Sequence, residues 1–291
     1  IKAVVLDENN QICYKSYERH KAQVRQKALD KLVELKKYTK EPFKFAISGS
    51  GALGLCEQGE LPFVQEVFAS ATGVSKLYPE TDCAIELGGE DAKILFFQGS
   101  VEQRMNSTCA GGTGAFIDQM ATLLNMSLEE MNEASLNYHR LYPIASRCGV
   151  FAKTDIQPLI NQGVDKCDLC ASIFQAVVDQ TITSLAQGRK IEGNILFLGG
   201  PLYFLSGLRK RFVETLKLSD AQVNCPETAI NFVALGTAIC ADQEYTYDEL
   251  YKALEDLVHA PAKLTESKPL FESEEDYQKF IERHKSHDAK Y

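Results

Sequence analysis

A particular order of strands, glycine turns and a helix constrains the fold of this chain more than any other feature. Three strand-like segments follow one another closely, at residues 83–87, 93–97 and 101–105. Gly88-Gly89 separates the first two, and tight glycine turns of this kind join antiparallel strands. A glycine-rich loop at residues 109–114 then leads into a helix, and an apolar strand is expected at residues 194–198. Three strands, a helix and a further strand are typical of a ribonuclease-H-like lobe.

The first eighty residues repeat part of this order. Strands are expected at residues 2–7, 12–17 and 43–48, with a polar helix between the last two. The opening strand and glycine turn of such a lobe have no counterpart here, so we interpret the N-terminus as truncated. The predicted fold class is α/β with two ribonuclease-H-like lobes. The expected limits are residues 1–80 and 226–260 for the first lobe, 81–225 for the second, and 261–291 for a linker with a charged tail helix.

The composition fits a folded protein with two lobes. Apolar residues make up 45% of the 291 residues and charged residues 24%, which are ordinary values for globular proteins. A chain of this length usually forms two domains. The net charge of −9 argues against nucleic acid as a ligand, and no apolar run approaches the roughly 18 residues of a membrane span. With no basic and apolar leader, we expect a cytoplasmic protein that binds neither nucleic acid nor membranes.

Nine cysteines are scattered along the chain, whereas histidine occurs only 5 times. An odd number of cysteines without a leader does not indicate a disulfide framework, so reduced thiols are expected. Cysteine chemistry would then be metal binding or redox work. The Cys167-Asp-Leu-Cys170 spacing matches a redox motif, but it stands at the start of a long helix with no strand before it. Two half-buried helix cysteines are the better interpretation, and metal binding is the alternative.

Gly88-Gly89 is followed directly by Glu90 and Asp91. The backbone amides of the two glycines, which carry no side chain, therefore lie next to the carboxylates of Glu90 and Asp91. Such a turn allows a phosphate group to approach the main chain, while carboxylates hold Mg²⁺ or its water shell. The alternative is an ordinary hairpin turn with solvated acids.

The loop at residues 109–114 (Cys-Ala-Gly-Gly-Thr-Gly) opens onto a helix N-terminus, where free amides and the helix dipole favour an anion. The anion would be nucleotide phosphate, a thiolate or both, and packing of a tight turn is the alternative.

Cys148-Gly149 again pairs a cysteine with a glycine at a helix start, and thiols at such positions bind soft metals. A cluster usually needs four thiolates, which two cysteines per chain supply only in a symmetric dimer. Buried packing of both thiols is the alternative.

Two further glycine motifs lead to different interpretations. Gly199-Gly200-Pro201 directly follows an apolar strand and resembles a place where backbone lies against a ribose or a flat ring. A simple strand terminator is the alternative. Residues 49–54 (Gly-Ser-Gly-Ala-Leu-Gly) match the dinucleotide fingerprint, but the following helix ends early and no strand with a terminal acid follows at the right distance. We do not interpret this motif as a dinucleotide site.

Five segments occur together in the order and spacing of a known family. They are residues 85–93 (IELGGEDAK), 106–116 (NSTCAGGTGAF), 148–153 (CGVFAK), 197–201 (FLGGP) and 234–238 (ALGTA). With these segments the chain resembles the ATPase activators of 2-hydroxyacyl-CoA dehydratases and the related benzoyl-CoA reductase ATPase subunits. The resemblance runs from residue 1 to about residue 242, and the two cysteine motifs are its most specific part.

The resemblance implies a fold of the actin, sugar-kinase and Hsp70 type, with a nucleotide cleft between the two lobes. It implies ATP or ADP and Mg²⁺ in that cleft, and a homodimer that shares one [4Fe–4S] cluster. ATP binding and hydrolysis would drive a low-potential electron to a dehydratase or reductase partner. Reduced ferredoxin or flavodoxin would be the electron donor.

The resemblance also assigns roles to residues of this chain. Cys109 and Cys148 match the cluster ligands, and Glu86, Glu90 and Asp91 would act on Mg²⁺ and water. The positions matched to the nucleotide are Gly88, Gly89, Gly111, Gly112, Thr113, Gly114, Gly199, Gly200, Pro201 and Gly236.

Some features depart from the family pattern. Glu86 and Glu90 stand where activators more often carry Asp and Gln, and Pro158 should kink or divide the helix after Cys148. The first phosphate turn of the family is absent. These features, with the tail after Pro261, resemble long multi-module relatives more than short activators.

The leading hypothesis from the sequence is an ATP-hydrolysing iron–sulfur electron donor, present as one module of a larger protein. The second hypothesis is a small-molecule kinase of the N-acetylhexosamine type with the same fold. The third is a nucleotide-sensing domain that binds ATP without hydrolysing it.

Overall fold

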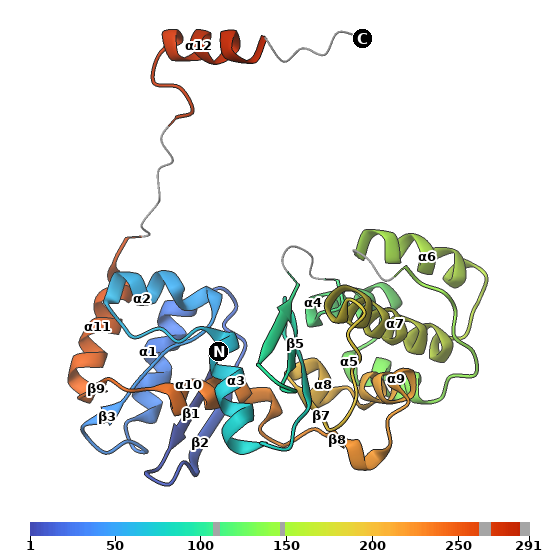
Figure 1. The fold of residues 1–291 in the computed structure, drawn as a ribbon, viewed down its shortest axis with the longest axis horizontal. Helices are drawn as coiled ribbons and strands as arrows, with labels where there is room; N and C mark the ends of the chain where they lie inside the picture. The colour runs from blue at the N-terminus through green and yellow to red at the C-terminus, as the bar shows by residue number, and fades with distance from the viewer. Residues whose placement is uncertain (107–110, 146–148, 262–268, 286–291) are drawn as a thin grey trace. The chain divides into compact units, whose positions relative to one another are not determined.

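The structure is a computed structural model that describes residues 1–106, 111–145, 149–261 and 269–285 (Figure 1). Residues 1–258 form one compact unit and residues 259–291 form a second. The first unit contains all of the glycine motifs and the cysteine-containing segments predicted above.

A five-stranded mixed sheet forms the centre of the second lobe, with the strand order β6-β5-β4-β7-β8. Its strands are β4 (Cys83–Leu87), β5 (Ala92–Phe96), β6 (Glu102–Met105), β7 (Ile195–Leu198) and β8 (Val223–Asn224). Strands β4, β5 and β6 pair antiparallel, whereas β7 runs parallel to β4 and β8 parallel to β7. The predicted meander and the predicted later strand are both confirmed.

The two faces of this sheet are covered by different helices. Because side chains alternate along a strand, Cys83, Ile85 and Leu87 of β4 enter one core while Ala84 enters another. The first core includes α4 (Gly114–Leu124), α5 (Leu128–Leu136), α7 (Lys166–Thr181) and α9 (Ser206–Leu216). The second includes α3 (Glu66–Leu77) and α10 (Phe232–Cys240), together with Val4 and Leu6, all from the residues expected to form the first lobe. Strand β4 is thus buried on both faces.

The first lobe contains smaller sheets and a third core. Besides α3 and α10, its elements include β1 (Lys2–Leu6), β2 (Ile12–Tyr17), α1 (Val24–Leu35), β3 (Phe43–Lys44), β9 (Glu244–Tyr245) and α11 (Tyr247–His259). Strands β1 and β2 form an antiparallel hairpin, and Leu29 and Leu32 of α1 pack with Leu250 and Leu254 of α11. The strand expected at residues 43–48 is shorter, because its partner β9 pairs with only two residues.

The remaining elements of the first unit are short, apart from α6. They are η1 (Ser50–Ala52), α2 (Leu53–Gly59), α6 (Gly149–Asn161), the π-helix η2 (Ile182–Ala186), α8 (Gly200–Phe204), η3 (Asp220–Gln222) and η4 (Ala229–Asn231). Pro158 does not divide α6, contrary to one of the two outcomes expected for it. Pro158 lies in the last turn, and the amide of Gln162 donates to its carbonyl at 3.0 Å, so helical bonding continues past the proline.

One stretch of the described residues, Lys166–Ala186, is long and apolar enough to cross a membrane by length and composition. Two thirds of its most apolar window, 67%, is buried inside the protein. This stretch comprises α7 and η2, and its side chains form part of the first core, including Phe174 and Val177. Its apolar composition is explained by this burial.

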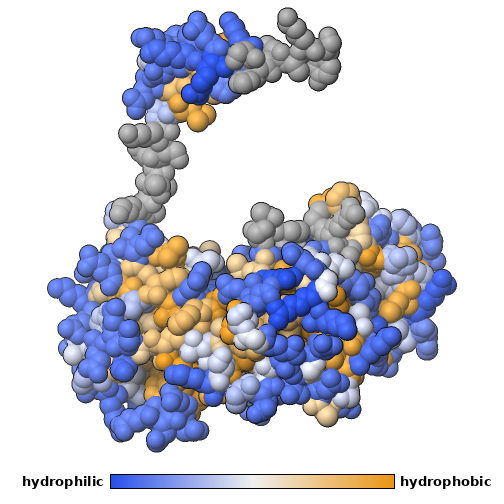
Figure 2. All heavy atoms as spheres, viewed as in Figure 1, coloured by the Kyte–Doolittle hydropathy of each residue, from blue (hydrophilic) through white to orange (hydrophobic). Residues whose placement is uncertain are grey.

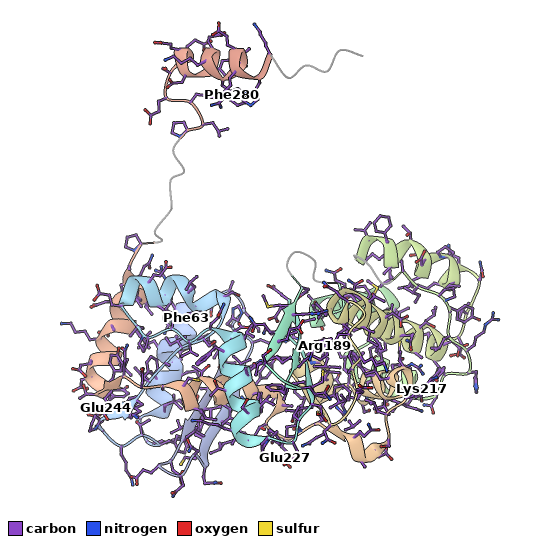
Figure 3. The ribbon with its side chains drawn as sticks, in the orientation of Figure 1. Phe63, Arg189, Lys217, Glu227, Glu244 and Phe280 are labelled. Carbon is purple, nitrogen blue, oxygen red and sulfur yellow. The ribbon has the colours of Figure 1, made fainter. Side chains whose placement is uncertain are left out.

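The second unit contains α12 (Glu274–Lys285), which bears acidic residues in its first turn and basic residues in its last. Figure 2 shows this helix as mostly hydrophilic with hydrophobic residues on one side. The ring of Phe271 lies 5.2 Å from those of Tyr277 and Phe280, measured between centroids. Figure 3 labels Phe280 on this helix. The predicted tail helix is therefore present, and Phe271, which precedes it, packs against two aromatic residues of the helix.

Candidate nucleotide site

Three glycine motifs from distant parts of the sequence meet at one end of the five-stranded sheet. The amide of Gly114, at the start of α4, donates to the carbonyl of Gly88 at 3.0 Å. A β-carbon built on Gly114 would lie 3.2 Å from Cγ of Pro201, which belongs to the third motif. The turn after β4, the start of α4 and the segment after β7 are therefore in direct contact.

Close packing requires a glycine at position 199 and also surrounds Gly88. Gly199 has φ +90° and ψ 162°, a conformation that is essentially restricted to glycine. A β-carbon on Gly199 would lie 2.0 Å from the carbonyl oxygen of Leu87, and one on Gly88 would lie 2.0 Å from Oδ1 of Asp91. The ends of β4 and β7 thus approach each other more closely than any side chain would allow.

Two other glycines leave open space in front of the backbone. No atom lies within 4 Å of a β-carbon built on Gly89 or on Gly200. Gly89 is exposed, and Gly200 is the first residue of α8. Bare backbone at such positions allows a phosphate or a ribose to approach the main chain. These two positions fit a bound nucleotide.

The N-terminus of α4 is partly used by the protein itself. The amide of Ala115 donates to the carbonyl of Gly89 at 2.7 Å, beside the bond between Gly114 and Gly88. These two amides therefore stabilise the turn and are not available to an anion. Gly112 has φ +80°, and its backbone packs against the side chain of Gln180 on α7. Residues 111–113 are buried, and their contact with a phosphate stays a prediction.

A buried lysine gathers the acidic residues next to the turn. Lys93 on β5 is 2% exposed, and its Nζ lies 2.6 Å from Oδ2 of Asp91 and 3.7 Å from Oε1 of Glu86. Its third partner is Oε2 of Glu66 on α3, at 2.6 Å. Burial alone would lower the pKa of Lys93, but the attraction of Glu86, Asp91 and Glu66 outweighs it and raises the pKa. Lys93 is therefore charged.

The three predicted catalytic acids differ in their access to solvent. Glu86 is 4% exposed, and its Oε2 accepts a hydrogen bond of 2.9 Å from Oγ of Ser70 on α3. The Asp91 side chain is 35% exposed, and Glu90 is exposed. The structure therefore brings Glu86 and Asp91 together on Lys93, while Glu90 points to solvent. Asp91 and Glu90 can reach a ligand, whereas Glu86 is held inside the protein.

Glu66 belongs to this site and was missed in the sequence. It lies in the first turn of α3, and a β-carbon on Gly49 would lie 3.4 Å from its Oε1. The glycine motif at residues 49–54, which we did not interpret as a dinucleotide site, thus begins beside the acidic cluster. Glu66 is the only charged residue between Leu61 and Ser75, and this lone charge in an apolar helix was the available signal.

Gly236 lies in a different environment from the other predicted nucleotide contacts. It is buried on α10, where a β-carbon would lie 2.1 Å from the carbonyl oxygen of Ala69 on α3. Gly73 of α3 faces the same contact, since its β-carbon would lie 3.4 Å from Cα of Gly236. Close packing of two helices explains the glycine here, and its contact with nucleotide stays a prediction.

The predicted cluster ligands, Cys109 and Cys148, lie outside the described residues. Within the described part of the chain, no group of three or more His, Cys, Asp or Glu residues is arranged to hold a metal ion. Cys167 and Cys170 are free thiols on α7, and burial raises the pKa of Cys170 to about 12. Cys170 is fully buried, so this pair is not an accessible redox site.

The fold and the glycine motifs define a protein of the actin-like class, with two ribonuclease-H-like lobes and a nucleotide cleft. Component A of (R)-2-hydroxyglutaryl-CoA dehydratase from Acidaminococcus fermentans has the same fold, with a TM-score of 0.69 and 25% identity over 87% of this chain and 94% of that one. The activator of 2-hydroxyisocaproyl-CoA dehydratase from Clostridium difficile, solved with bound ADPNP, also shares the fold, with a TM-score of 0.69 and 24% identity over 87% and 92% of the two chains. The predicted fold class is confirmed.

The sequence family agrees with the fold. The profile of the BadF/BadG/BcrA/BcrD ATPase family matches residues 1–241, so the chain belongs to this ATPase family. The activator of lactoyl-CoA dehydratase from Anaerotignum propionicum is 30% identical over 220 residues, which are 74% of this chain and 82% of that protein. The resemblance stated from the sequence motifs is therefore confirmed.

Proposed function

We propose that this chain is an ATP-dependent iron–sulfur electron donor that activates a 2-hydroxyacyl-CoA dehydratase or a related reductase. Membership of the ATPase family and the activators among its relatives support this proposal. The observation that carries it is the meeting of Gly88, Gly114 and Pro201, which brings three nucleotide motifs to one place.

The nucleotide would bind where the backbone is open. Gly89 and Gly200 leave room for phosphate and ribose, because no side chain lies in front of either position. Asp91 and Glu90 would act on the water shell of the Mg²⁺ that accompanies the nucleotide, and would orient the attacking water. Glu86 would hold its neighbours in place, since Ser70 and Lys93 already engage both of its oxygens.

Cys109 and Cys148 would hold one [4Fe–4S] cluster together with the same two residues of a second copy, in a homodimer. When bound, the cluster would take one electron from reduced ferredoxin or flavodoxin and pass it to the dehydratase or reductase. Thiolate ligands suit such a cluster, and the start of α6 directly follows Cys148, so the positive end of a helix lies next to that thiol in sequence.

Nucleotide binding can be tested with a matched pair of variants. Gly89→Leu places a side chain where nothing lies within 4 Å, so the fold should tolerate it while phosphate is excluded. We expect at least a tenfold loss of ATP affinity, measured by isothermal titration. Gly54→Leu is the control, because Gly54 also has open space but lies on α2. Unchanged ATP affinity in Gly89→Leu would contradict this nucleotide site.

Electron donation can be tested on protein purified without oxygen. Each dimer should contain the four iron atoms of one [4Fe–4S] cluster. Cys109→Ser should remove the charge-transfer absorbance of the cluster. A cluster spectrum that survives this substitution would reject Cys109 as a ligand. Phosphate transfer to an N-acetylhexosamine without iron would favour the kinase hypothesis, and ATP binding without hydrolysis would favour a nucleotide-sensing domain.

A further inference from the structure

Lys93 has a role that neither the glycine motifs nor the proposed hydrolysis explains. Among the described residues, Lys93 is the cation that forms ion pairs with all three of Glu66, Glu86 and Asp91. Its side chain is 3% exposed, and a charged lysine at that depth is stable only when opposite charges surround it. The three acids supply those charges.

The acids come from three separate elements, so they meet only in the folded protein. Glu66 begins α3, Glu86 lies on β4, and Asp91 lies in the turn before β5. Three carboxylates and one ammonium leave a net charge of −2 when all four groups are ionised. A cluster with this many oxygens and this charge has the composition of a divalent-cation site, although the three acids are not arranged to hold a metal ion in this structure.

The position of the ammonium conflicts with direct metal binding. Nζ of Lys93 lies 2.6 Å from both Glu66 and Asp91, between the oxygens that a metal would need. A directly coordinated Mg²⁺ requires oxygen ligands at about 2.0–2.1 Å, so it would have to displace this ammonium. The ammonium is attached to a buried strand and cannot leave the site in the way that a bound ion can.

We propose that Lys93 is the resident cation of this cleft and occupies the place that a directly coordinated divalent metal would take. It fixes Glu66 and Asp91, and Ser70 fixes Glu86 from the other side. The acids are therefore oriented before any ligand arrives. Divalent metal then enters the cleft only with the nucleotide, and this last statement rests on the proposed function. Lys93 is a positioning residue, because it acts through the three acids.

Binding of Mn²⁺ to the nucleotide-free chain of residues 1–291 tests this proposal. Free Mn²⁺ can be counted by electron paramagnetic resonance. We expect the wild-type protein and Asp91→Asn to bind Mn²⁺ equally weakly, because Lys93 already occupies the acids. Lys93→Met should bind Mn²⁺ at least tenfold more tightly than wild type. Lys76→Met, which removes an exposed lysine of α3 outside the cluster, should behave like wild type.

A second comparison applies if Lys93→Met does not fold. Glu66→Gln removes one acid, and adding Lys93→Met in that background leaves fewer unpaired charges than the single variant does. We expect the double variant to bind Mn²⁺ more tightly than Glu66→Gln alone. Tight Mn²⁺ binding by wild type that Asp91→Asn abolishes would overturn the proposal, as would equal binding with and without Lys93.

These measurements contain no ATP, so they do not depend on hydrolysis. A protein that fails to bind nucleotide but gains Mn²⁺ affinity without Lys93 would contradict the proposed function and support the resident cation. A protein that binds nucleotide normally but gains no Mn²⁺ affinity without Lys93 would support the proposed function and contradict the resident cation.

Discussion

The amide of Gly114 donates a 3.0 Å hydrogen bond to the carbonyl of Gly88, which makes two glycine motifs one structural unit. The turn after β4 accepts the first amides of α4, so the position of the turn and the direction of the helix are set together. Gly114 itself is tightly enclosed, since its β-carbon would lie within 3.3 Å of the Gly89 backbone. A ligand that contacts the turn therefore binds backbone that is hydrogen-bonded to the start of α4.

Gly199 and Gly200 are adjacent, but only Gly199 is tightly packed, so the same substitution should change stability differently at the two positions. Gly199→Ala should destabilise the protein by roughly 2–4 kcal/mol, because its backbone conformation is unsuited to alanine and the methyl group would overlap the Leu87 carbonyl. Gly200→Ala has room in a helix, so it should keep or slightly raise the free energy of unfolding. Urea unfolding measures both. Equal stability of the two variants would show that the ends of β4 and β7 are further apart than described.

Asp168 should make the stability of the protein depend on acid pH. Its carboxylate accepts the amides of Arg140 at 3.0 Å and His139 at 2.7 Å, and these bonds hold its pKa below the usual value. A lowered native pKa stabilises the protein above the unfolded pKa, near 3.9, and this contribution is lost as the pH falls through the native pKa. At neutral pH, Asp168→Asn should cost roughly 1–2 kcal/mol, since a neutral acceptor forms weaker bonds.

The measurement for Asp168 is urea unfolding at several pH values. The stability difference between wild type and Asp168→Asn should shrink as the pH falls, because protonated Asp168 also lacks charge. Asp168→Ala removes both hydrogen bonds and should remain less stable than wild type at every pH. A difference between wild type and Asp168→Asn that did not change with pH would argue against a charged Asp168.

The thiols should differ widely in their reaction with iodoacetamide. Cys13 is exposed, whereas Cys83 and Cys170 are at most 1% exposed and burial raises the pKa of each to about 12. Because the thiolate is the reactive form, Cys83 and Cys170 should be alkylated only when the protein unfolds. Mass spectrometry of peptides after labelling in buffer and in urea gives the comparison. Rapid labelling of Cys170 in buffer would mean that α7 is not buried as described.

A third glycine comparison tests the contact between α3 and α10. Gly236→Ala should cost about 1–3 kcal/mol, because the added methyl group would overlap the Ala69 carbonyl. Gly54→Ala on α2 has open space and should instead stabilise its helix by about 0.5–1 kcal/mol. The two variants place the same change in two helices, and thermal unfolding compares them. Similar stability of both variants would contradict the close helix contact.

The sequence predicted those features that depend on neighbouring residues. Strand β4 agrees with the expected residues 83–87, because an apolar run ends at Gly88 and the turn chemistry is local. The five-residue strand 101–105 begins one residue late, at Glu102. The convergence of the glycine motifs followed from their resemblance to a family and not from spacing alone.

The sequence could not predict contacts that join distant segments. Glu66 reaches Lys93 only because α3 packs on the sheet that contains β5, and no periodic pattern connects these two residues. The pairing of Ala115 with Gly89 was also missed, since a helix N-terminus looks the same in a sequence whether its amides bind a ligand or another turn. Strands β3 and β9 pair across about two hundred residues, and each is only two residues long.

The contact between Gly236 and Ala69 limits how α3 and α10 can move relative to each other. Two helices that touch through their main chains have no side chains at that point to compress or repack. They can therefore turn about the contact, but they cannot be pushed closer there. Because Glu66 lies one turn from Ala69 on α3, the same contact also fixes the end of the helix that brings Glu66 to Lys93.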